Sequence, residues 1–305
     1  RFPGPLSCAG KARLFMGEGF ENRRVLAIHD LSGAGKCSLT VVLPVLSALG
    51  CEVTVLPTAA LSTHTGGFCD PVYRDLTGDM LPWARHWLRE GACFDAVYSG
   101  FLGSAAQIEI VREIFGMFRA VNPAVQVLVD PVMGDGGRLY KTYTREMADG
   151  MARLCAAADI IVPNATEAYN LLGEPYREGP CTQAEAARVL RGLLALGPRA
   201  AVLTGIQPDA AQTGAACMVR GGDIETALAP RVPGGYHGTG DAFAAALLGA
   251  LLNGKDLPAA CGCAARFTSE CCRKTLEMGD YDRRWGIKFE ICLPFVMNDV
   301  LSLEK

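Results

Sequence analysis

A run of small residues followed by a carboxylate marks one place where this sequence could do chemistry. Gly238, Thr239, Gly240 and Asp241 begin a long apolar stretch with no further polar side chain before Asn253. The stretch predicts a buried helix, and the first backbone N–H groups of a helix have no partner within it. Together with the helix dipole, these groups would bind an anion such as a phosphate. The alternative is that Asp241 only caps the helix, since aspartate is a favoured N-cap residue.

A second glycine-rich stretch, SGAGKC at residues 32–37, follows a short apolar run and looks at first like a phosphate-binding loop. The P-loop pattern G-x-x-x-x-G-K-[ST] needs glycine at position 30 and serine or threonine at position 37. Asp30 and Cys37 stand there instead, and a thiol is a poor ligand for a hard cation. We therefore exclude a P-loop and expect a tight turn at 32–37 that lets a ligand approach the backbone.

Short apolar runs alternate with helical periodicity from Arg24 onward. The predicted strands are 25–29, 52–58, 94–100, 125–130, 159–164 and 200–205. The predicted helices are 34–49, one that begins at Ser104, 144–157, 165–172, 182–196 and the apolar stretch after Gly240. This alternation predicts a mostly parallel sheet covered by helices on both faces.

Ligands of such sheets bind beyond the carboxyl ends of the strands. Several predicted strands end in residues suited to ligand binding, namely Asp30, Asp130, Asn164 and Thr204–Gly205. Each has an ordinary structural explanation as well: Asn164 and Glu167 would form a helix-capping box, and Asp130 before a proline would begin a turn. Their convergence on one edge of the sheet favours a site.

Composition excludes several classes of protein. The 305 residues are 50% hydrophobic and 20% charged with a net charge of −3, and no basic block or long apolar run interrupts them. We therefore expect a cytoplasmic protein that binds neither nucleic acid nor membrane and keeps its 13 scattered cysteines as reduced, apolar side chains. Residues 1–22 are expected to be a poorly ordered leader or expression remnant, followed by a single domain over residues 23–305.

Several further motifs occur in a characteristic order. They are AIHDLSGAGKCSLTVVLPVLSALG (27–50), LSTHTGGF (61–68), YSGFLGS (98–104), VDPVMGD (129–135), IIVPNATEA (160–168) and GTGD (238–241). This ordered set resembles the pyridoxal/pyridoxamine kinase branch of the ribokinase-like superfamily over roughly residues 23–275. The resemblance implies a three-layer α/β/α fold with a mostly parallel central sheet and a small β lid, for which residues 51–68 are the candidate. It also implies a homodimer.

The resemblance assigns roles residue by residue. Asp241 matches the catalytic base, which also contacts the substrate, and Gly238, Thr239 and Gly240 match the anion hole for the transferred phosphoryl group. Asn164 and Glu167 match an N-x-x-E motif that organises hydrated magnesium, and Asp130 matches an acidic position near the same metal. Thr204 and Gly205 match a strand end along the nucleotide. Asp30 matches the position that hydrogen-bonds the pyridine ring, and Thr65 matches a second substrate contact.

The implied activity is transfer of a phosphoryl group from ATP to the 5′-hydroxymethyl group of pyridoxal, pyridoxamine or pyridoxine, with Mg²⁺ and a monovalent cation such as K⁺. Many relatives carry glutamine where Gly66 stands, which leaves the preferred vitamer open. One alternative is a hydroxymethylpyrimidine kinase, although some of those carry cysteine at the position of Asp241. The others are a sugar or nucleoside kinase, for which the STHTGG and DPVMGD motifs are wrong, and a non-catalytic protein that binds the vitamer or nucleotide.

Overall fold

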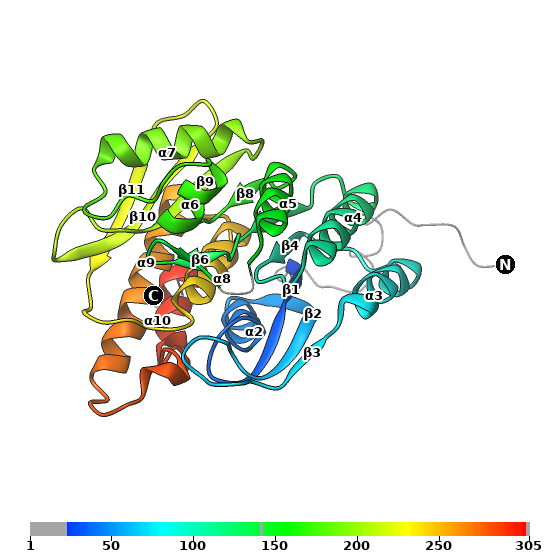
Figure 1. The fold of residues 1–305 in the computed structure, drawn as a ribbon, viewed down its shortest axis with the longest axis horizontal. Helices are drawn as coiled ribbons and strands as arrows, with labels where there is room; N and C mark the ends of the chain where they lie inside the picture. Colours follow the sequence, from blue (N-terminus) through cyan, green and yellow to red (C-terminus); the bar gives the residue numbers. More distant parts are fainter. Residues whose placement is uncertain (1–22, 141–142, 303–305) are drawn as a thin grey trace.

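The computed structural model describes residues 23–140 and 143–302. Its main strands are β1 (Arg23–Ala34), β2 (Cys51–Thr63), β3 (Tyr73–Asp75), β4 (Ala96–Ser99), β5 (Gln126–Val129), β8 (Ile160–Ile161), β9 (Ala200–Ile206), β10 (Gln212–Val219) and β11 (Glu225–Pro230). Within the described residues they form one nine-stranded sheet in the order β11-β10-β9-β8-β5-β4-β1-β2-β3 (Figure 1). The six strands from β9 to β2 in this order run parallel, and only the outer pairs are antiparallel.

Helices cover both faces of the sheet, as the sequence predicts (Figure 1). One face packs against α2 (Leu39–Ala48), α8 (Thr239–Leu252), α9 (Leu257–Leu276) and α10 (Leu293–Leu301). The other face packs against α3 (Thr77–Arg89), α4 (Ala105–Val121), α5 (Arg145–Ala156), α6 (Ala165–Leu171) and α7 (Gln183–Ala195). The two short helices η2 (Arg283–Trp285) and η3 (Glu290–Cys292) lie between α9 and α10 in the chain.

Helix α8 is the most deeply buried element near the predicted site. Every residue from Ala242 to Ala250 is buried, which explains why its sequence lacks polar residues on any side. It packs between α2 and α9 against the sheet, so its first turn is held rigidly at the sheet edge. Among the described residues, no helix combines the length and apolarity needed to cross a bilayer.

The end of β1 differs from the sequence prediction. The strand was expected to stop at residue 29 and the turn to occupy 32–37, but β1 continues to Ala34 and the turn follows it at 35–38. Ser32 and Ala34 pair with Leu61 and Thr63 of β2, past the point where β4 stops pairing with β1. Pairing with β2 therefore overrides the turn propensity of the glycines, and helix α2 begins at Leu39 rather than near 34.

The projecting ends of β1 and β2, with β3, form a small β extension beyond the main sheet (Figure 1). This is the lid expected over residues 51–68. The sequence analysis did not predict α3, although this helix is amphipathic, nor β10 and β11, which lie at the sheet's antiparallel edge. Residues 1–22 lie outside the described part of the chain, so the expectations about a leader and about domain boundaries stay predictions.

Candidate active site

The carboxyl ends of the parallel strands bring the predicted site residues to one edge of the sheet. Asp30 lies within β1 where its pairing with β4 has ended, Asp130 directly follows β5, and Asn164 bridges to Thr204 of β9. Asp30, Asp130 and Glu167 are each less than a tenth exposed. Carboxyl groups are rarely buried without a partner or a function, so their number here is itself a signal.

Asp241 occupies the first turn of α8 but does not cap it. The N-cap is Gly238, in a left-handed conformation with φ 81°, and the helix has no side-chain cap. The Asp241 carboxylate instead accepts a hydrogen bond from the backbone N–H of Ser38, with 2.8 Å between Oδ2 and N. The capping alternative for Asp241 is therefore wrong, and its carboxyl is turned toward the turn at 35–38.

Gly238 also allows an unusually close approach of two backbones. A Cβ at this position would lie 2.3 Å from the carbonyl oxygen of Lys36, so only glycine fits. The amides at the start of α8 lack helical partners by the geometry of any helix, and the dipole adds a partial positive charge there. Residues 238–240 therefore form a helix start of the kind that can bind an anion, and their binding of a phosphate stays a prediction.

Asn164 and Glu167 form the capping box that was the structural alternative for them. The Asn164 side chain accepts from Glu167 N at 3.0 Å, and Asn164 N donates to Glu167 Oε2 at 2.9 Å. Glu167 Oε1 also accepts from Met133 N at 3.0 Å. The capping role does not remove Glu167 from the site, because the same bonds fix its buried carboxylate beside Asp130.

A two-residue turn joins β6 (Gly134–Asp135) and β7 (Arg138–Leu139), and the start of α6 anchors this hairpin. Asn164 Nδ2 donates to Gly134 O at 2.9 Å, and Gly137 N donates to the Thr166 hydroxyl at 2.9 Å. The DPVMGD motif (130–135) therefore leads from Asp130 at the end of β5 into this hairpin, whose first strand is formed by the last two residues of the motif.

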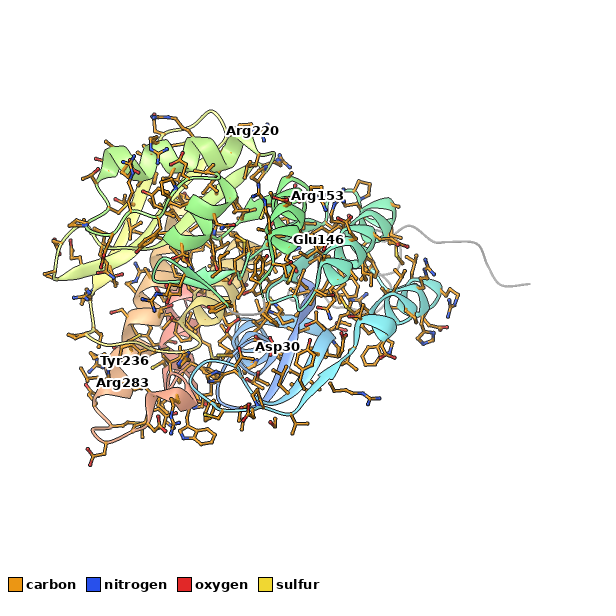
Figure 2. All side chains as sticks on the ribbon, viewed as in Figure 1. Asp30, Glu146, Arg153, Arg220, Tyr236 and Arg283 are labelled. Atoms are coloured by element: carbon orange, nitrogen blue, oxygen red, sulfur yellow. The ribbon has the colours of Figure 1, made fainter. Side chains whose placement is uncertain are left out.

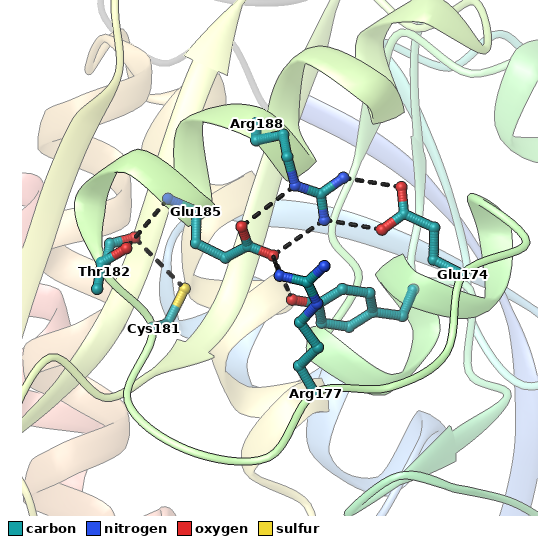
Figure 3. A network of polar contacts seen from close by, with 7 residues as sticks. Glu174, Arg177, Cys181, Thr182, Glu185 and Arg188 are labelled. Atoms are coloured by element: carbon teal, nitrogen blue, oxygen red, sulfur yellow. Dashed lines mark hydrogen bonds and ion pairs between the residues drawn. The ribbon is translucent and has the colours of Figure 1, made fainter.

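The far end of α6 is fixed by a polar network centred on Arg188 of α7 (Figure 3). Arg188 makes paired hydrogen bonds of 2.8 and 2.7 Å to Glu174 and also donates to Glu185. The Tyr169 hydroxyl of α6 donates to Glu185 at 2.6 Å. Since a bidentate, shared arginine restricts both partners, the network holds α6 and with it the capping box in register.

Burial dominates the electrostatics of the acidic groups. It raises the pKa of Asp130 well above its usual range, and the neighbouring charges of Glu167 and Asp241 raise it further. Burial raises the pKa of Glu167 to about 7 against the opposing effect of its backbone hydrogen bonds. It also raises the pKa of Asp241 to about 7, opposed by the Ser38 N–H and reinforced by the charge of Asp30. A carboxyl that titrates near neutrality is suited to accept a proton from a substrate.

Asp30, labelled in Figure 2, accepts hydrogen bonds from two hydroxyl groups. Ser38 Oγ donates to Oδ1 at 2.5 Å and Ser32 Oγ donates to Oδ2 at 2.8 Å. Desolvation raises the pKa of Asp30 despite these bonds. Ser38 therefore touches both Asp30 and Asp241, a connection that the sequence did not reveal. The sequence places Ser38 inside the helix predicted over 34–49, and only the fold shows its two distant partners.

A hydrogen bond joins the segment after β2, at His64, to the segment after α9, at Arg284. His64 Nδ1 accepts from Gly66 N at 3.1 Å, so its Nε2 carries the hydrogen and donates to Arg284 O at 2.6 Å. The His64 ring lies 4.8 Å from that of His237, and a Cβ on Gly66 would clash with His237. Thr65, between His64 and Gly66, is exposed, and neither histidine was predicted to contribute to the site.

A hollow of about 340 Å³ opens next to the start of α8. It is lined by Asp135 of the hairpin, residues 235–237 and residues 282–284. Arg283 lies over the Tyr236 ring, 4.8 Å from its centre, and both are labelled in Figure 2. Thr204 and Gly205 lie near the carboxyl end of β9, where Thr204 bridges to Asn164. Thr204 is half-buried, and Gly205 is exposed with φ 68°. All the predicted site residues thus lie along one edge of the sheet or on the loops above it.

Replacing Gly238 by alanine tests whether the helix start binds an anion. Gly238→Ala must adopt a positive φ, at a cost of roughly 1–2 kcal/mol for L-residues, and must also relieve the clash with Lys36 O. Gly254→Ala is a matched control, since Gly254 has φ 86° but open space around its Cβ position. Urea unfolding should show a larger decrease in the free energy of unfolding for Gly238→Ala than for Gly254→Ala. Calorimetry should show weaker phosphate binding for Gly238→Ala alone. Equal losses of phosphate affinity in both variants would contradict the assignment.

Comparison with known proteins agrees with this geometry. Residues 46–284 match the family model described as phosphomethylpyrimidine kinase. A pyridoxal kinase (PdxY) of Rubrobacter xylanophilus is 30% identical over 84% of this chain and 88% of its own length. A pyridoxine/pyridoxal/pyridoxamine kinase of Bordetella avium is 32% identical over 80% of this chain and 82% of its own.

Solved structures give the same result. The pyridoxal kinase of Lactobacillus plantarum is 31% identical, superposes with a TM-score of 0.83, and the match covers 93% of this chain and 99% of that one. A Bacteroides thetaiotaomicron protein, provisionally described as a phosphomethylpyrimidine kinase and solved with pyridoxal, is 38% identical with a TM-score of 0.85. That match covers 90% of this chain and 96% of the other. This chain belongs to the pyridoxal kinase family of the ribokinase-like superfamily.

Proposed function

We propose that this protein transfers the γ-phosphoryl group of ATP to the 5′-hydroxymethyl group of pyridoxal and related B6 vitamers. The observation that carries the proposal is the placement of Asp241. Its carboxyl has a pKa near neutrality, is oriented by the Ser38 N–H, and lies in the first turn of a buried helix whose leading amides suit a phosphate. A proton acceptor beside an anion hole is what phosphoryl transfer to an alcohol requires.

The residues then have distinct tasks. Asp241 accepts the proton of the vitamer hydroxyl through the carboxylate oxygen that Ser38 does not hold. The hydroxyl oxygen forms a bond to the γ-phosphorus as the bond to the β–γ bridging oxygen breaks, and ADP leaves with that electron pair. The amides of residues 238–240 stabilise the charge on the transferred group. The resemblance assigns Thr204 and Gly205 to the nucleotide and Asp30 and Thr65 to the vitamer, and these roles are part of the proposal.

The residues at the edge of the sheet suit a magnesium ion. Asp130 and Glu167 offer hard oxygen ligands. Both are buried, and the charge of Glu167 raises the pKa of Asp130, so a divalent cation would stabilise the two ionised groups side by side. Magnesium characteristically takes one or two protein carboxylates, with phosphate oxygens and water completing its shell. When bound, it would neutralise charge on the phosphates, and Asn164 would keep Glu167 in place.

The relatives support a vitamer as the acceptor. The Bacteroides thetaiotaomicron structure was solved with pyridoxal, and several relatives are pyridoxal kinases. The family model favours a second candidate, a hydroxymethylpyrimidine kinase. ATP consumption with pyridoxal, pyridoxamine, hydroxymethylpyrimidine and ribose tests the two directly. Turnover of hydroxymethylpyrimidine alone would replace the proposal with the second candidate. A monovalent cation, a homodimer and a cytoplasmic location stay predictions.

Lys36 should be dispensable for ATP binding, because it is not the lysine of a P-loop. Its ammonium group pairs with Glu290 at 2.5 Å and lies over the Phe289 ring, toward the C-terminal segment rather than the helix start. Lys36→Ala should leave the KM for ATP within a few fold of the parent value. Steady-state kinetics with Glu290→Gln as the control would separate a lost ion pair from a lost phosphate contact. A large rise in the KM for ATP in Lys36→Ala alone would place the phosphates at this turn instead.

Removing one buried carboxylate should weaken the metal site. Glu167→Gln keeps the shape and the back-bond to Asn164 but loses the charge beside Asp130, so the Mg²⁺ concentration for half-maximal rate should rise. Glu113→Gln, which removes an exposed carboxylate of α4 that pairs with Arg85, is the control and should leave that concentration unchanged. Full activity of the parent in excess chelator would remove the metal from the proposal.

Asp241→Asn distinguishes a catalytic role of Asp241 as proton acceptor from a purely structural role as hydrogen-bond partner of Ser38. The amide keeps the side-chain shape and an acceptor for Ser38 N–H but cannot take a proton, so kcat should fall by about 10²–10⁴-fold while ATP still binds. In the parent, kcat should rise with pH through about 7, since the base must be ionised. A variant with parental turnover would contradict the mechanism.

The same variant makes a prediction about stability. The folded-state pKa of Asp241 is raised, so ionising this carboxyl destabilises the fold progressively as pH rises from about 4, its ordinary value, to about 7. Asparagine carries no such penalty. The thermal midpoint of Asp241→Asn, compared with that of the parent, should therefore improve across this pH range, and calorimetry at several pH values measures it.

A further inference from the structure

Ser38 makes two hydrogen bonds that connect the proposed base to the predicted vitamer contact. Its backbone N–H donates to Asp241 Oδ2 at 2.8 Å, and its hydroxyl donates to Asp30 Oδ1 at 2.5 Å. Ser38 is buried, and its partners lie on different elements, β1 and α8. One residue therefore fixes the relative positions of two carboxyl groups that are far apart in the sequence.

The backbone of Ser38 is strained. Its φ is 53° and its ψ is −130°, and a positive φ costs an L-residue free energy that glycine avoids. Ser38 is the N-cap residue of α2, yet its side chain makes no capping bond to that helix. The hydroxyl is used instead on Asp30, whose other oxygen is held by Ser32. The bond to Asp30 thus holds the strained backbone in the one conformation that aims its N–H at Asp241.

We propose, on the basis of the function proposed above, that Ser38 is a positioning residue for phosphoryl transfer: its clamped backbone N–H holds one oxygen of Asp241 so that the other faces the substrate hydroxyl. The hydroxyl of Ser38 acts through the backbone, by keeping it strained, and not on the substrate itself. Asp30, in addition to any contact with the vitamer, accepts the hydrogen bond that fixes the conformation of Ser38.

Several groups surround the Asp241 carboxyl and set its proton affinity. The Ser38 N–H lowers the pKa of Asp241, and the charge of Asp30 raises it. The carboxyl of Asp130, the Cys37 thiol and the hydroxyls of Tyr98 and Tyr140 also lie within its electrostatic reach, each with its own pKa raised by burial. Of these influences, only the Ser38 N–H depends on the conformation of residue 38.

The test compares Ser38→Ala with Ser38→Gly. Both variants lose the hydroxyl. Glycine adopts the required φ without strain and so keeps its N–H on Asp241. Alanine at this φ is strained and lacks the hydrogen bond to Asp30 that holds the backbone in place. Ser38→Ala should lose about 10–100-fold in kcat, since displacing a reacting group by about 1 Å can cost that much, with a smaller change in the vitamer KM. Ser38→Gly should recover most of the loss. Ser32→Ala, which removes the other hydroxyl from Asp30, should change the vitamer KM more than kcat.

A second readout needs no turnover. The ¹³C resonance of the Asp241 carboxyl, identified by its absence in Asp241→Asn, gives its pKa directly. In Ser38→Ala the pKa of Asp241 should rise above its parental value of about 7, because a hydrogen bond to the ionised form is lost. In Ser38→Gly and Ser32→Ala it should stay at the parental value.

Stability alone does not decide the matter, because glycine is also the better replacement at a helix N-cap. A parental kcat and a parental Asp241 pKa in folded Ser38→Ala would overturn the proposal, whatever its thermal midpoint. Equal kcat losses in Ser38→Ala and Ser38→Gly would also overturn it, since the hydroxyl would then act directly. If the parent itself fails to phosphorylate pyridoxal, the proposed function falls, while the carboxyl titration still decides whether Ser38 positions Asp241.

Discussion

The site depends on one close approach between two backbone segments that are 203 residues apart in the sequence. The turn after β1 meets the start of α8, where Gly238 lies against the carbonyl of Lys36 and the Ser38 N–H reaches Asp241. A side chain at position 238 would separate the two segments. The burial of α8 between α2 and α9 holds the segments together, so packing energy far from the chemistry fixes the geometry of the base.

Structural and chemical roles coincide in the same residues. Asn164 and Glu167 cap α6 as an ordinary capping box, and this bonding is what holds the Glu167 carboxylate beside Asp130. The capping box at the start of α6 is therefore compatible with the metal site that we propose at Glu167. Asp241 is the opposite case: Gly238 occupies the N-cap, so Asp241 is free to bond outside its helix.

Much of the fold was predictable because the secondary structure that the local hydrophobic patterns favour is the one that the core strands and helices adopt. The parallel core strands and the helices beside them follow from continuous apolar runs, and their carboxyl ends place Asp130, Asn164 and Thr204 correctly. The extension of β1 to Ala34 was not predictable, because pairing with β2 overrides the turn propensity of its glycine. Ser38 and His64 were missed because their partners, Asp241 and Arg284, lie in distant segments that no local pattern connects.

The concentration of acidic groups constrains how this site can work. Asp30, Asp130, Glu167 and Asp241 share one edge of the sheet, and burial raises the pKa of each. Lys36, a nearby cation, is paired with Glu290. When ionised, these buried carboxyl groups would repel the phosphates of a nucleotide that lacks a bound cation. We therefore propose that a divalent cation held by Asp130 and Glu167, together with the helix amides, would offset this repulsion. Burial and the charge of Asp30 raise the pKa of Asp241 to about 7, which suits it to accept a proton near neutral pH.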